Sequence, residues 1–239
     1  MPEMKVSSTK DISRFLKSGV YIDCDSTEVR GFTTEALKGL ADKSETSCAI
    51  RLFNVVRDSI RYNPYSLGFK PEQYRASYII TQDSAFCVPK AILLTACLRA
   101  AGIPAAVGFS DVRNHINSPK LTELMQTDLF IYHGYVKLWL DGKSYKVTPA
   151  FNMALCERFG IKPLIFDGRS DALFHEFDTR DQRHMEYVND RGVFEDAPID
   201  EILIDFKKTY PRFEEFQLQQ DATEPNANYD AKFSVSLSE

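Results

Sequence analysis

The chain has 239 residues, of which 44% are hydrophobic and 12% aromatic, enough to bury one substantial core. Lys and Arg total 29 against 34 Asp and Glu, a formal net charge of −5, and no dense basic run occurs, which argues against nucleic acid as a partner. No apolar run approaches the roughly 20 residues that cross a bilayer, so we expect no membrane association.

The cysteines indicate a reducing compartment. There are five, without a CxxC pair, and the N-terminal MPEMKVSSTKDISRF lacks the apolar stretch of a secretory signal. The cytoplasm is therefore the expected location. The sequence contains no internal repeat, no phosphate-binding glycine loop and no zinc-ligand spacing, so it predicts no metal and no organic cofactor.

The N-terminal part, residues 1–62, is predicted to be mostly helical, with one extended piece around Gly19 to Cys24. One helix is predicted to start at Thr33. A second, amphipathic helix is predicted between residues 44 and 62, where serines can cap its start. The turn formers and aromatic residues that follow, NPYSLGFKPEQYRAS, predict a surface loop leading to Ala76.

A short buried helix with a cysteine at its start is predicted in AFCVPKAILLTACLRAAGIPA. Apolar residues recur at helical spacing, Gly102 follows the last turn and Pro104 prevents continuation. Pro89 fits the first turn, where its missing N–H loses no partner. Cys87 then lies at or next to the N-cap, where unpaired N–H groups and the helix dipole favour a thiolate. The alternative is that Cys87 packs as a small hydrophobic residue.

The strongest strand signal is a β-hairpin in LFIYHGYVKLWLDGKSYKVTPAF, with Asp141-Gly142 as its turn. Its first strand alternates between a face with His133, Tyr135, Lys137 and Trp139 and a face with Gly134, Val136, Leu138 and Leu140. Before the hairpin, AAVGFSDVRNH predicts a strand that ends near Asp111, and SPKLTELMQTD predicts a polar, helical insertion.

The C-terminal third has weaker signals. Beyond Asn152 the sequence is irregular, with a short helix predicted over residues 154–159 and another over residues 199–210. Residues 216–239 are polar and low in large aliphatic residues, so we expect a loosely attached or disordered tail. We therefore predict a single domain over residues 1–215.

A nucleophilic cysteine needs a base that takes its proton and later protonates the leaving group, and histidine does both near neutral pH. His133 lies 46 residues after Cys87 (133 − 87), where a strand could bring it to the start of the cysteine helix. The alternative is that His133 is a half-buried strand residue without a chemical role.

Two ordered motifs carry a family resemblance. AFCVPKAILLTACLRAAGIPAAVGF followed by HGYVKLWLDGKSYKVTP closely resembles the transglutaminase-like superfamily, a branch of the papain-like cysteine enzymes, and is most similar to its bacterial stand-alone members. The resemblance covers about residues 76–149. We predict that residues 76–152 form the motif core of the domain. It implies an α+β, papain-like fold in which the nucleophile helix packs on a small antiparallel β-sheet.

The resemblance implies that Cys87 is the nucleophile and His133 its general base and acid. The family's third member is an aspartate fifteen residues after the histidine, and Thr148 occupies that position here. A threonine hydroxyl can accept a hydrogen bond from the imidazole but carries no charge to stabilise an imidazolium. Asn152 is a second candidate for this role. Asp128 and Asp111 are acidic candidates that folding could bring close.

Acyl transfer also needs donors for the oxyanion. The backbone N–H of Cys87 is one candidate. Gln82 is another in the manner of papain-like enzymes, although its spacing is not diagnostic and a solvated loop glutamine is the favoured interpretation.

The sequence thus predicts cysteine-dependent acyl transfer through a thioester, by a hydrolase or cysteine protease, or by a transglutaminase-type acyltransferase. The substrate would be a peptide, a protein or a small amide. The alternative is a catalytically inactive transglutaminase-like binding or scaffold module, which the threonine at the aspartate position favours.

Overall fold

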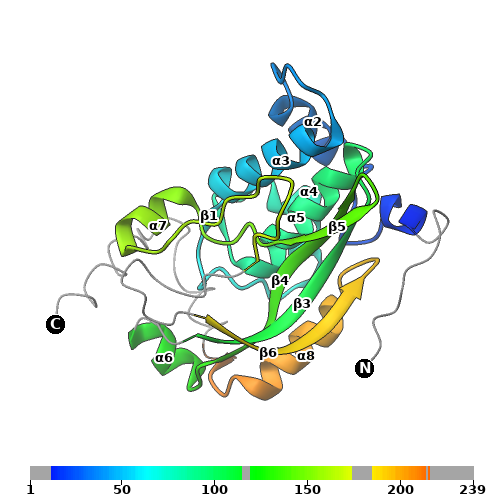
Figure 1. Cartoon of the computed structure of the whole chain (residues 1–239). Helices are drawn as coiled ribbons and strands as arrows, with labels where there is room; N and C mark the ends of the chain where they lie inside the picture. Colours follow the sequence, from blue (N-terminus) through cyan, green and yellow to red (C-terminus); the bar gives the residue numbers. More distant parts are fainter. Residues whose placement is uncertain (1–11, 115–118, 174–184, 214, 216–239) are drawn as a thin grey trace.

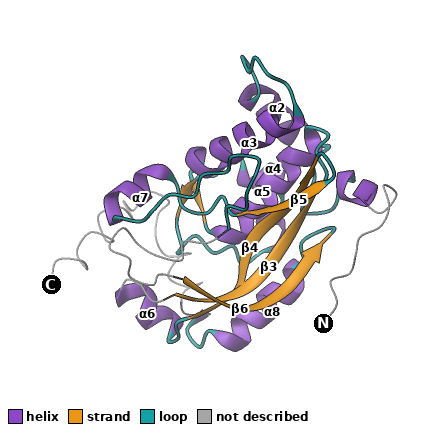
Figure 2. Cartoon of the chain, in the orientation of Figure 1, coloured by secondary structure: helices purple, strands orange, loops and turns teal. Residues whose placement is uncertain are grey.

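The computed structural model describes residues 12–114, 119–173, 185–213 and 215. Its centre is a four-stranded antiparallel sheet with the strand order β5-β4-β3-β6. Figure 1 shows α5 and α8 behind this sheet, and Figure 2 shows that helices and strands both contribute substantially. The fold is therefore α+β with a helix packed on a small antiparallel sheet, as predicted. The bounds are β3 (Ala105–Asn114), β4 (Leu129–Leu140), β5 (Lys143–Val147), β6 (Met185–Phe194), α5 (Cys87–Ala100) and α8 (Ile199–Thr209).

The predicted hairpin is confirmed as β4 and β5. Val136 pairs with Val147, and the register continues to Leu140 opposite Lys143. The turn between them, Asp141-Gly142, has φ angles of 49° and 76°, a left-handed conformation that glycine and aspartate tolerate best. The far end of β4 carries Trp139, whose ring stacks on Phe15 at a centroid distance of 4.8 Å.

Helix α5 is buried along nearly its whole length. Every residue from Val88 to Arg99 is buried, so the helix has no polar, solvated face. It contacts the sheet on one side and three further helices on the other. This confirms the predicted short buried helix. The three helices are α2 (Thr27–Ala36), α3 (Glu45–Ser59) and α4 (Ala76–Ile79).

One lysine is enclosed within this helical packing. Lys90 on α5 is 0% exposed, and its Nζ donates a 2.8 Å hydrogen bond to the carbonyl of Arg57 and another to the carbonyl of Ile60. These carbonyls lie at the C-terminal end of α3, where helix geometry leaves them without intrahelical partners. Burial lowers the pKa of Lys90 to about 7, although the nearby carboxylate of Asp58 opposes this shift. Lys90 therefore joins the end of α3 to the first turns of α5.

Two predictions for the N-terminal part are wrong. Helix α2 begins at Thr27, not at Thr33, because the side chain of Ser26 caps it by accepting the N–H of Val29. Thr33 is buried within this helix. The segment from Gly19 to Cys24 contains no strand, because its backbone N–H groups turn toward a side chain, the carboxylate of Asp196.

The other predicted helices are present, but β6 and two strands of two residues each, over residues 61–62 and 84–85, were not predicted. Ser44 caps α3 as predicted, and the helices expected in the insertion, near residue 154 and near residue 199 all form. Strand β6 lies in a stretch predicted to be irregular, and β3 continues three residues beyond Asp111. The predicted tail, residues 216–239, lies outside the described residues. The remaining elements are η1 (Ser13–Leu16), β1 (Arg61–Tyr62), η2 (Pro71–Tyr74), β2 (Ser84–Ala85), α6 (Pro119–Met125) and α7 (Met153–Phe159).

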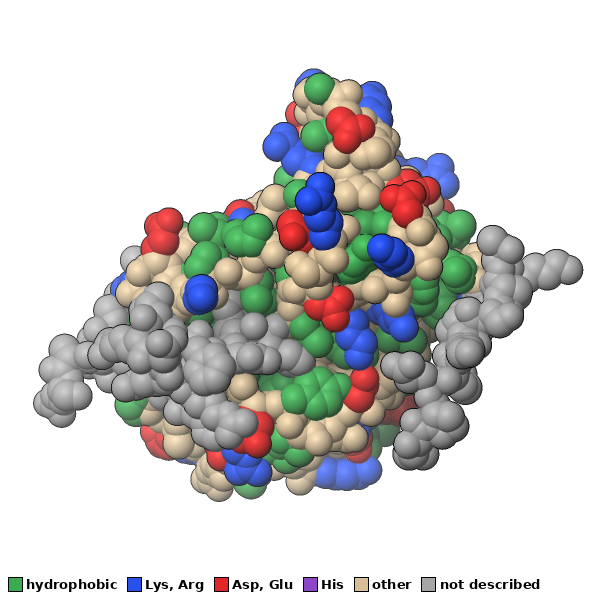
Figure 3. All heavy atoms as spheres, viewed as in Figure 1, with side chains coloured by type: hydrophobic (Ala, Val, Ile, Leu, Met, Phe, Trp, Pro, Cys, Tyr) green, Lys and Arg blue, Asp and Glu red, His purple; other side chains and the backbone are tan. Residues whose placement is uncertain are grey.

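Charged side chains of both signs are interspersed on the face shown in Figure 3, over the described part of the chain. Within the described ranges, no helix has the length and apolarity to span a membrane.

Replacing Lys90 with Met should lower the free energy of unfolding by about 2–4 kcal/mol, because two buried carbonyls lose their donor. The folded protein releases the Lys90 proton near pH 7, whereas the unfolded chain keeps it until about pH 10.5. The stability of the wild type should therefore rise relative to Lys90→Met above pH 7, by at most about 1.4 kcal/mol per pH unit.

Urea unfolding of wild type and Lys90→Met at several pH values from 6 to 9 measures both effects. Subtracting the two free energies of unfolding at each pH cancels the contribution of other titrating groups. Leu94→Met, a volume-conserving change in the same helix, serves as the control and should cost less than about 1.5 kcal/mol. A pH-independent difference between wild type and Lys90→Met would contradict the prediction.

Candidate active site

Cys87 is the first residue of α5. Its neighbour Phe86 is the N-cap and has extended backbone angles, and Pro89 lies in the first turn as predicted. Cys87 is partly exposed, while Val88 and the rest of the helix are buried. The cysteine thus lies at the N-terminal start of the helix, where the burial of the helix is incomplete.

Strand β4 approaches this helix end at Gly134. A Cβ atom on Gly134 would lie 2.8 Å from the carbonyl oxygen of Cys87 and 3.0 Å from Cα of Val88. Both contacts involve backbone atoms that cannot move aside cheaply. The backbone of Gly134 also forms a hydrogen bond with the Cys87 thiol. The fold therefore brings the strand residue next to His133 into direct contact with Cys87.

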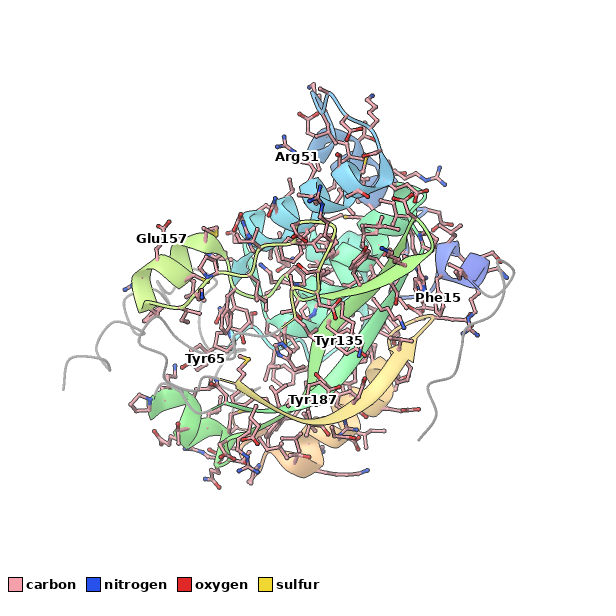
Figure 4. The ribbon with its side chains drawn as sticks, viewed as in Figure 1. Phe15, Arg51, Tyr65, Tyr135, Glu157 and Tyr187 are labelled. Carbon is pink, nitrogen blue, oxygen red and sulfur yellow. The ribbon has the colours of Figure 1, made fainter. Side chains whose placement is uncertain are left out.

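His133 is buried, with 5% of its surface exposed, and lies opposite Ser110 on β3. Strand alternation places its side chain on the same face of the sheet as Tyr135. Figure 4 shows Tyr135 and Tyr187 on the face turned to the viewer. The hydroxyl of Ser110 is buried without a hydrogen-bond partner among the described residues. The histidine thus adjoins a polar group on the neighbouring strand.

The pKa of the Cys87 thiol differs from the prediction. Burial raises it to about 11, and backbone hydrogen bonds from Gly134 and Val88 only partly oppose this shift. The position at a helix start was predicted to make the thiol more acidic. That prediction is wrong for the thiol alone, because protein atoms packed around it remove more solvation from a thiolate than the helix start restores.

Thr148 contacts the backbone of Gly134, the residue that also lies against Cys87. It is buried, and its hydroxyl donates a 2.9 Å hydrogen bond to the carbonyl oxygen of Gly134. Its own N–H donates to the carbonyl of Ala172 at 2.8 Å. Since the hydroxyl hydrogen is engaged, the oxygen can act toward an imidazole only as an acceptor. Thr148 therefore fixes the end of β5 against the strand that carries His133.

Asn152 is linked to the surroundings of the cysteine through Tyr62. Its Oδ1 accepts a 3.1 Å hydrogen bond from the N–H of Tyr62, and it is the N-cap residue of α7. Tyr62 packs with Phe151 and Cys87 in one apolar cluster. The carbonyl end of the Asn152 amide is thus engaged in holding β1 beside Cys87.

The two other predicted supporting residues have partners of their own. The amide of Gln82 donates to the hydroxyl of Thr81 at 2.8 Å. Asp128 forms a half-exposed ion pair with Arg113 at 2.9 Å, and four residues of β4 lie between it and His133, five steps that span about 16 Å of strand. Asp128 therefore lies away from the histidine.

A β-bulge immediately precedes His133. Ser110 pairs with His133, and the next pair along the strands is Val112 with Phe130, so β4 has one more residue than β3 in this interval. Tyr132 lies within the bulge and has a φ of 56°, which is uncommon for a residue other than glycine. Bulges of this kind re-aim the neighbouring side chains. The direction of His133 is thus set by an irregularity of its own strand.

Asp111 stabilises this bulge. Its carboxylate, 7% exposed as a residue, accepts the N–H of Tyr132 at 3.1 Å and the Nε of Arg191 at 2.6 Å. Arg191 is itself the extra residue of a bulge in β6, and its guanidinium lies 3.9 Å from the centroid of the Tyr132 ring. Asp111 therefore links two bulges on either side of β3. It was predicted as an acidic candidate for the third triad member, whereas Tyr132 and Arg191 were not singled out, because no local pattern pairs them.

Residues 33–149 match the family model described as Transglutaminase-like superfamily. These residues belong to the transglutaminase-like superfamily. A search of curated proteins finds no match. Among solved structures, the chain is similar to a putative cysteine protease from Cytophaga hutchinsonii, with 16% identity, a TM-score of 0.46 and coverage of 80% of this chain. The chain spans 57% of the length of that protein.

The transglutaminase-like segment contains Cys87, His133 and Thr148, and it ends three residues before Asn152. It also contains Asp111 and Gly134, so both residues that shape β4 around the histidine lie within it. The part of the chain that the structure describes holds no group of three or more His, Cys, Asp or Glu residues arranged to bind a metal ion.

Replacing Gly134 with Ala should lower the free energy of unfolding by about 1–3 kcal/mol, because the new methyl group would overlap the backbone of α5. It should also slow alkylation of Cys87 by displacing the strand from the thiol. Gly31→Ala is the control, since a Cβ there meets nothing within 4 Å, and in the middle of α2 it should stabilise by about 0.5–1 kcal/mol. Urea unfolding measures both. Equal stability of Gly134→Ala and wild type would show that the close contact is absent.

Replacing Asp111 with Asn should lower the free energy of unfolding by about 2 kcal/mol, because Arg191 loses a mostly buried ionic partner. Asp128→Asn is the matched control. Its ion pair with Arg113 is half-exposed and should contribute less than about 1 kcal/mol. Thermal and urea unfolding of both variants would test this, and a loss at Asp128 as large as that at Asp111 would contradict it.

Proposed function

We propose that the protein is a cysteine-dependent acyl-transfer enzyme in which Cys87 is the nucleophile and His133 the general base and acid. The observation that carries this proposal is the contact of Gly134 with the first turn of α5, because it places the strand bearing His133 beside the thiol. Membership of residues 33–149 in the transglutaminase-like superfamily supports it.

The first step would begin with transfer of the thiol proton to His133. The sulfur then attacks the carbonyl carbon of an amide or ester, a C–S bond forms, and the carbonyl oxygen becomes an oxyanion. The backbone N–H of Cys87 is positioned at a helix start, where it can donate to that oxyanion. Collapse of the oxyanion breaks the C–N or C–O bond, and the imidazolium returns the proton to the departing amine or alcohol.

The second step would resolve the thioester. His133 takes a proton from water or an amine, whose oxygen or nitrogen attacks the thioester carbonyl, and the C–S bond breaks with return of the proton to sulfur. Water gives a hydrolase or protease, and an amine gives a transglutaminase. We favour hydrolysis of a peptide or amide, since water is the default acceptor in a cleft open to solvent.

Thr148 would act as a positioning residue. It holds the backbone at Gly134 and offers an oxygen to the imidazole, but it supplies no charge. Asn152 would support the site through Tyr62.

The second candidate function is a binding or scaffold module on the same fold. Two observations favour it: a threonine replaces the expected aspartate, and burial raises the pKa of the Cys87 thiol to about 11. An isolated thiol with that pKa would be ionised in about one molecule in ten thousand at pH 7.

Reaction with iodoacetamide separates the two candidates. If Cys87 and His133 form a thiolate–imidazolium pair, Cys87 should react at pH 7 at least ten times faster than Cys48, a partly exposed cysteine whose pKa is raised by burial. The His133→Ala variant should lose that advantage and react only at alkaline pH. Mass spectrometry of the digested protein reports both cysteines in one sample. Slow alkylation of Cys87 at neutral pH in the wild type would leave the scaffold function standing.

A further inference from the structure

A row of polar residues crosses the sheet at the level of the candidate base. His133 on β4 is paired with Ser110 on β3, and Ser110 is paired on its other side with Asp190 on β6. Residues directly opposite each other in an antiparallel sheet point to the same face, with their Cβ atoms about 4.5–5.5 Å apart. The three side chains therefore lie next to one another, with Ser110 in the middle. We call these three residues the polar row.

A hydrogen bond shows which face of the sheet the polar row occupies. The hydroxyl of Tyr135, two residues beyond His133 on β4, donates to Oδ1 of Asp190 at 2.9 Å. The Tyr135 side chain can cross β3 because Gly108 lies beneath it, where a Cβ atom would overlap the tyrosine ring. By strand alternation His133 shares this face, which is turned to the viewer in Figure 4.

The middle residue of the row has a hydroxyl that the fold does not use. Ser110 is 0% exposed, and its hydroxyl has no hydrogen-bond partner among the described residues. A buried polar group without a partner costs folding free energy, so such groups are rare in folded proteins. An alanine would fill nearly the same space without that cost. The stability of the fold therefore does not explain a serine at this position.

The acidic neighbour of Ser110 is already engaged. Oδ1 of Asp190 accepts the hydroxyl of Tyr135 and the N–H of Gly192, and Oδ2 accepts Nζ of Lys146 at 3.0 Å. Although burial opposes the effect, these bonds hold the pKa of Asp190 below its usual value. The charge of the carboxylate is matched by that of Lys146, so the pair exerts little net field on the imidazole. The imidazole is thus the neighbour toward which the serine hydroxyl can turn.

An imidazole that acts as a base needs an acceptor for its second nitrogen. One ring nitrogen takes up the thiol proton, and the hydrogen bond made by the other sets the tautomer. That second bond becomes charge-assisted, and about twice as strong, once the ring is an imidazolium. A serine hydroxyl oxygen can accept it. The oxygen lies one bond from its Cβ and the ring nitrogens lie two or three bonds from theirs, so opposite strand positions bring them within reach.

We propose that Ser110 is a positioning residue for His133, whose imidazole N–H donates a hydrogen bond to the serine hydroxyl when the ring takes the proton of Cys87. This inference rests on the proposed acyl-transfer function and adds a residue to it. The hydroxyl hydrogen of Thr148 is committed to the carbonyl of Gly134. The hydroxyl of Ser110 has no such commitment, so it can rotate as the charge on the ring develops.

The protonation of His133 tests the proposal directly. In the Cys87→Ala background no thiol titrates together with the ring, and NMR of protein labelled with carbon-13 at histidine Cε1 follows each imidazole separately. The His133 signal is assigned by its loss in His133→Ala. Adding Ser110→Ala should lower the pKa of His133 by about 0.7, a fivefold shift toward the neutral ring, because the imidazolium loses an acceptor.

The reactivity of Cys87 gives a second measurement with the full-length chain. Ser110→Ala alone should slow alkylation by iodoacetamide at pH 7 about fivefold and move the pH profile of the reaction to higher pH. The urea midpoint should stay the same or rise, because a buried hydroxyl without a partner is removed. A serine with a merely structural role would lower the urea midpoint and leave the pH profile unchanged.

Thr95→Val is the matched control. Thr95 on α5 is also 0% exposed, but its hydroxyl donates to the carbonyl of Ala91 at 2.8 Å and lies outside the polar row. Removing this hydroxyl should leave both the pKa of His133 and the pH profile of Cys87 alkylation unchanged.

The outcomes separate this proposal from the proposed function. An unchanged His133 pKa in Ser110→Ala, an equal change in Thr95→Val, or a ring that stays neutral down to about pH 5 with and without Ser110 would overturn the role of the serine. None of these would overturn acyl transfer, which the alkylation of Cys87 relative to Cys48 decides. A lowered His133 pKa together with slow alkylation of wild-type Cys87 would support the hydrogen bond and overturn the acyl-transfer function.

Discussion

The arrangement of the candidate site depends on the absence of a side chain at Gly134. Because no Cβ is present there, the backbone of β4 can lie against the carbonyl of Cys87 and the Cα of Val88. That contact fixes the start of α5 relative to the sheet, and it determines which strand residue adjoins the thiol. Since α5 is buried from Val88 to Arg99, the helix cannot shift to make room for a larger residue at position 134.

The same close packing explains the electrostatics of Cys87. A helix start stabilises an anion only through the few N–H groups that it exposes, whereas the protein atoms packed around the sulfur remove the solvation that the anion needs. In this protein burial prevails and the pKa of the thiol rises. Any thiolate at this position therefore depends on a partner that takes up the proton close by. His133 is the residue proposed above for this purpose, and Thr148 holds the backbone of the neighbouring Gly134 without supplying charge.

The sequence predicted the elements with a strong local signal. The Cys87 helix has uniform apolar content and a clear stop at Gly102, and the hairpin has strict alternation and an Asp-Gly turn, so both elements could be predicted from local pattern. Strand β6 could not, because two bulges interrupt its alternation. The start of α2 was misplaced because Ser26 and Thr33 present similar capping signals and only tertiary packing decides between them. Lys90 and the pair of Asp111 with Arg191 depend on residues that are distant in sequence, which no local pattern reveals.

The bulge before His133 has a consequence for how this protein can change during evolution. Strand residues alternate between the two faces of the sheet. Deleting the extra residue of β4 would therefore move every side chain on one side of the deletion to the opposite face. The histidine would then leave the face that it shares with Tyr135, or the apolar residues nearer Leu129 would change faces instead. Substitutions along β4 can be absorbed one at a time, but a deletion in it cannot. We therefore expect the length of this strand between Asp128 and Gly134 to be constrained more tightly than the identity of most of its residues.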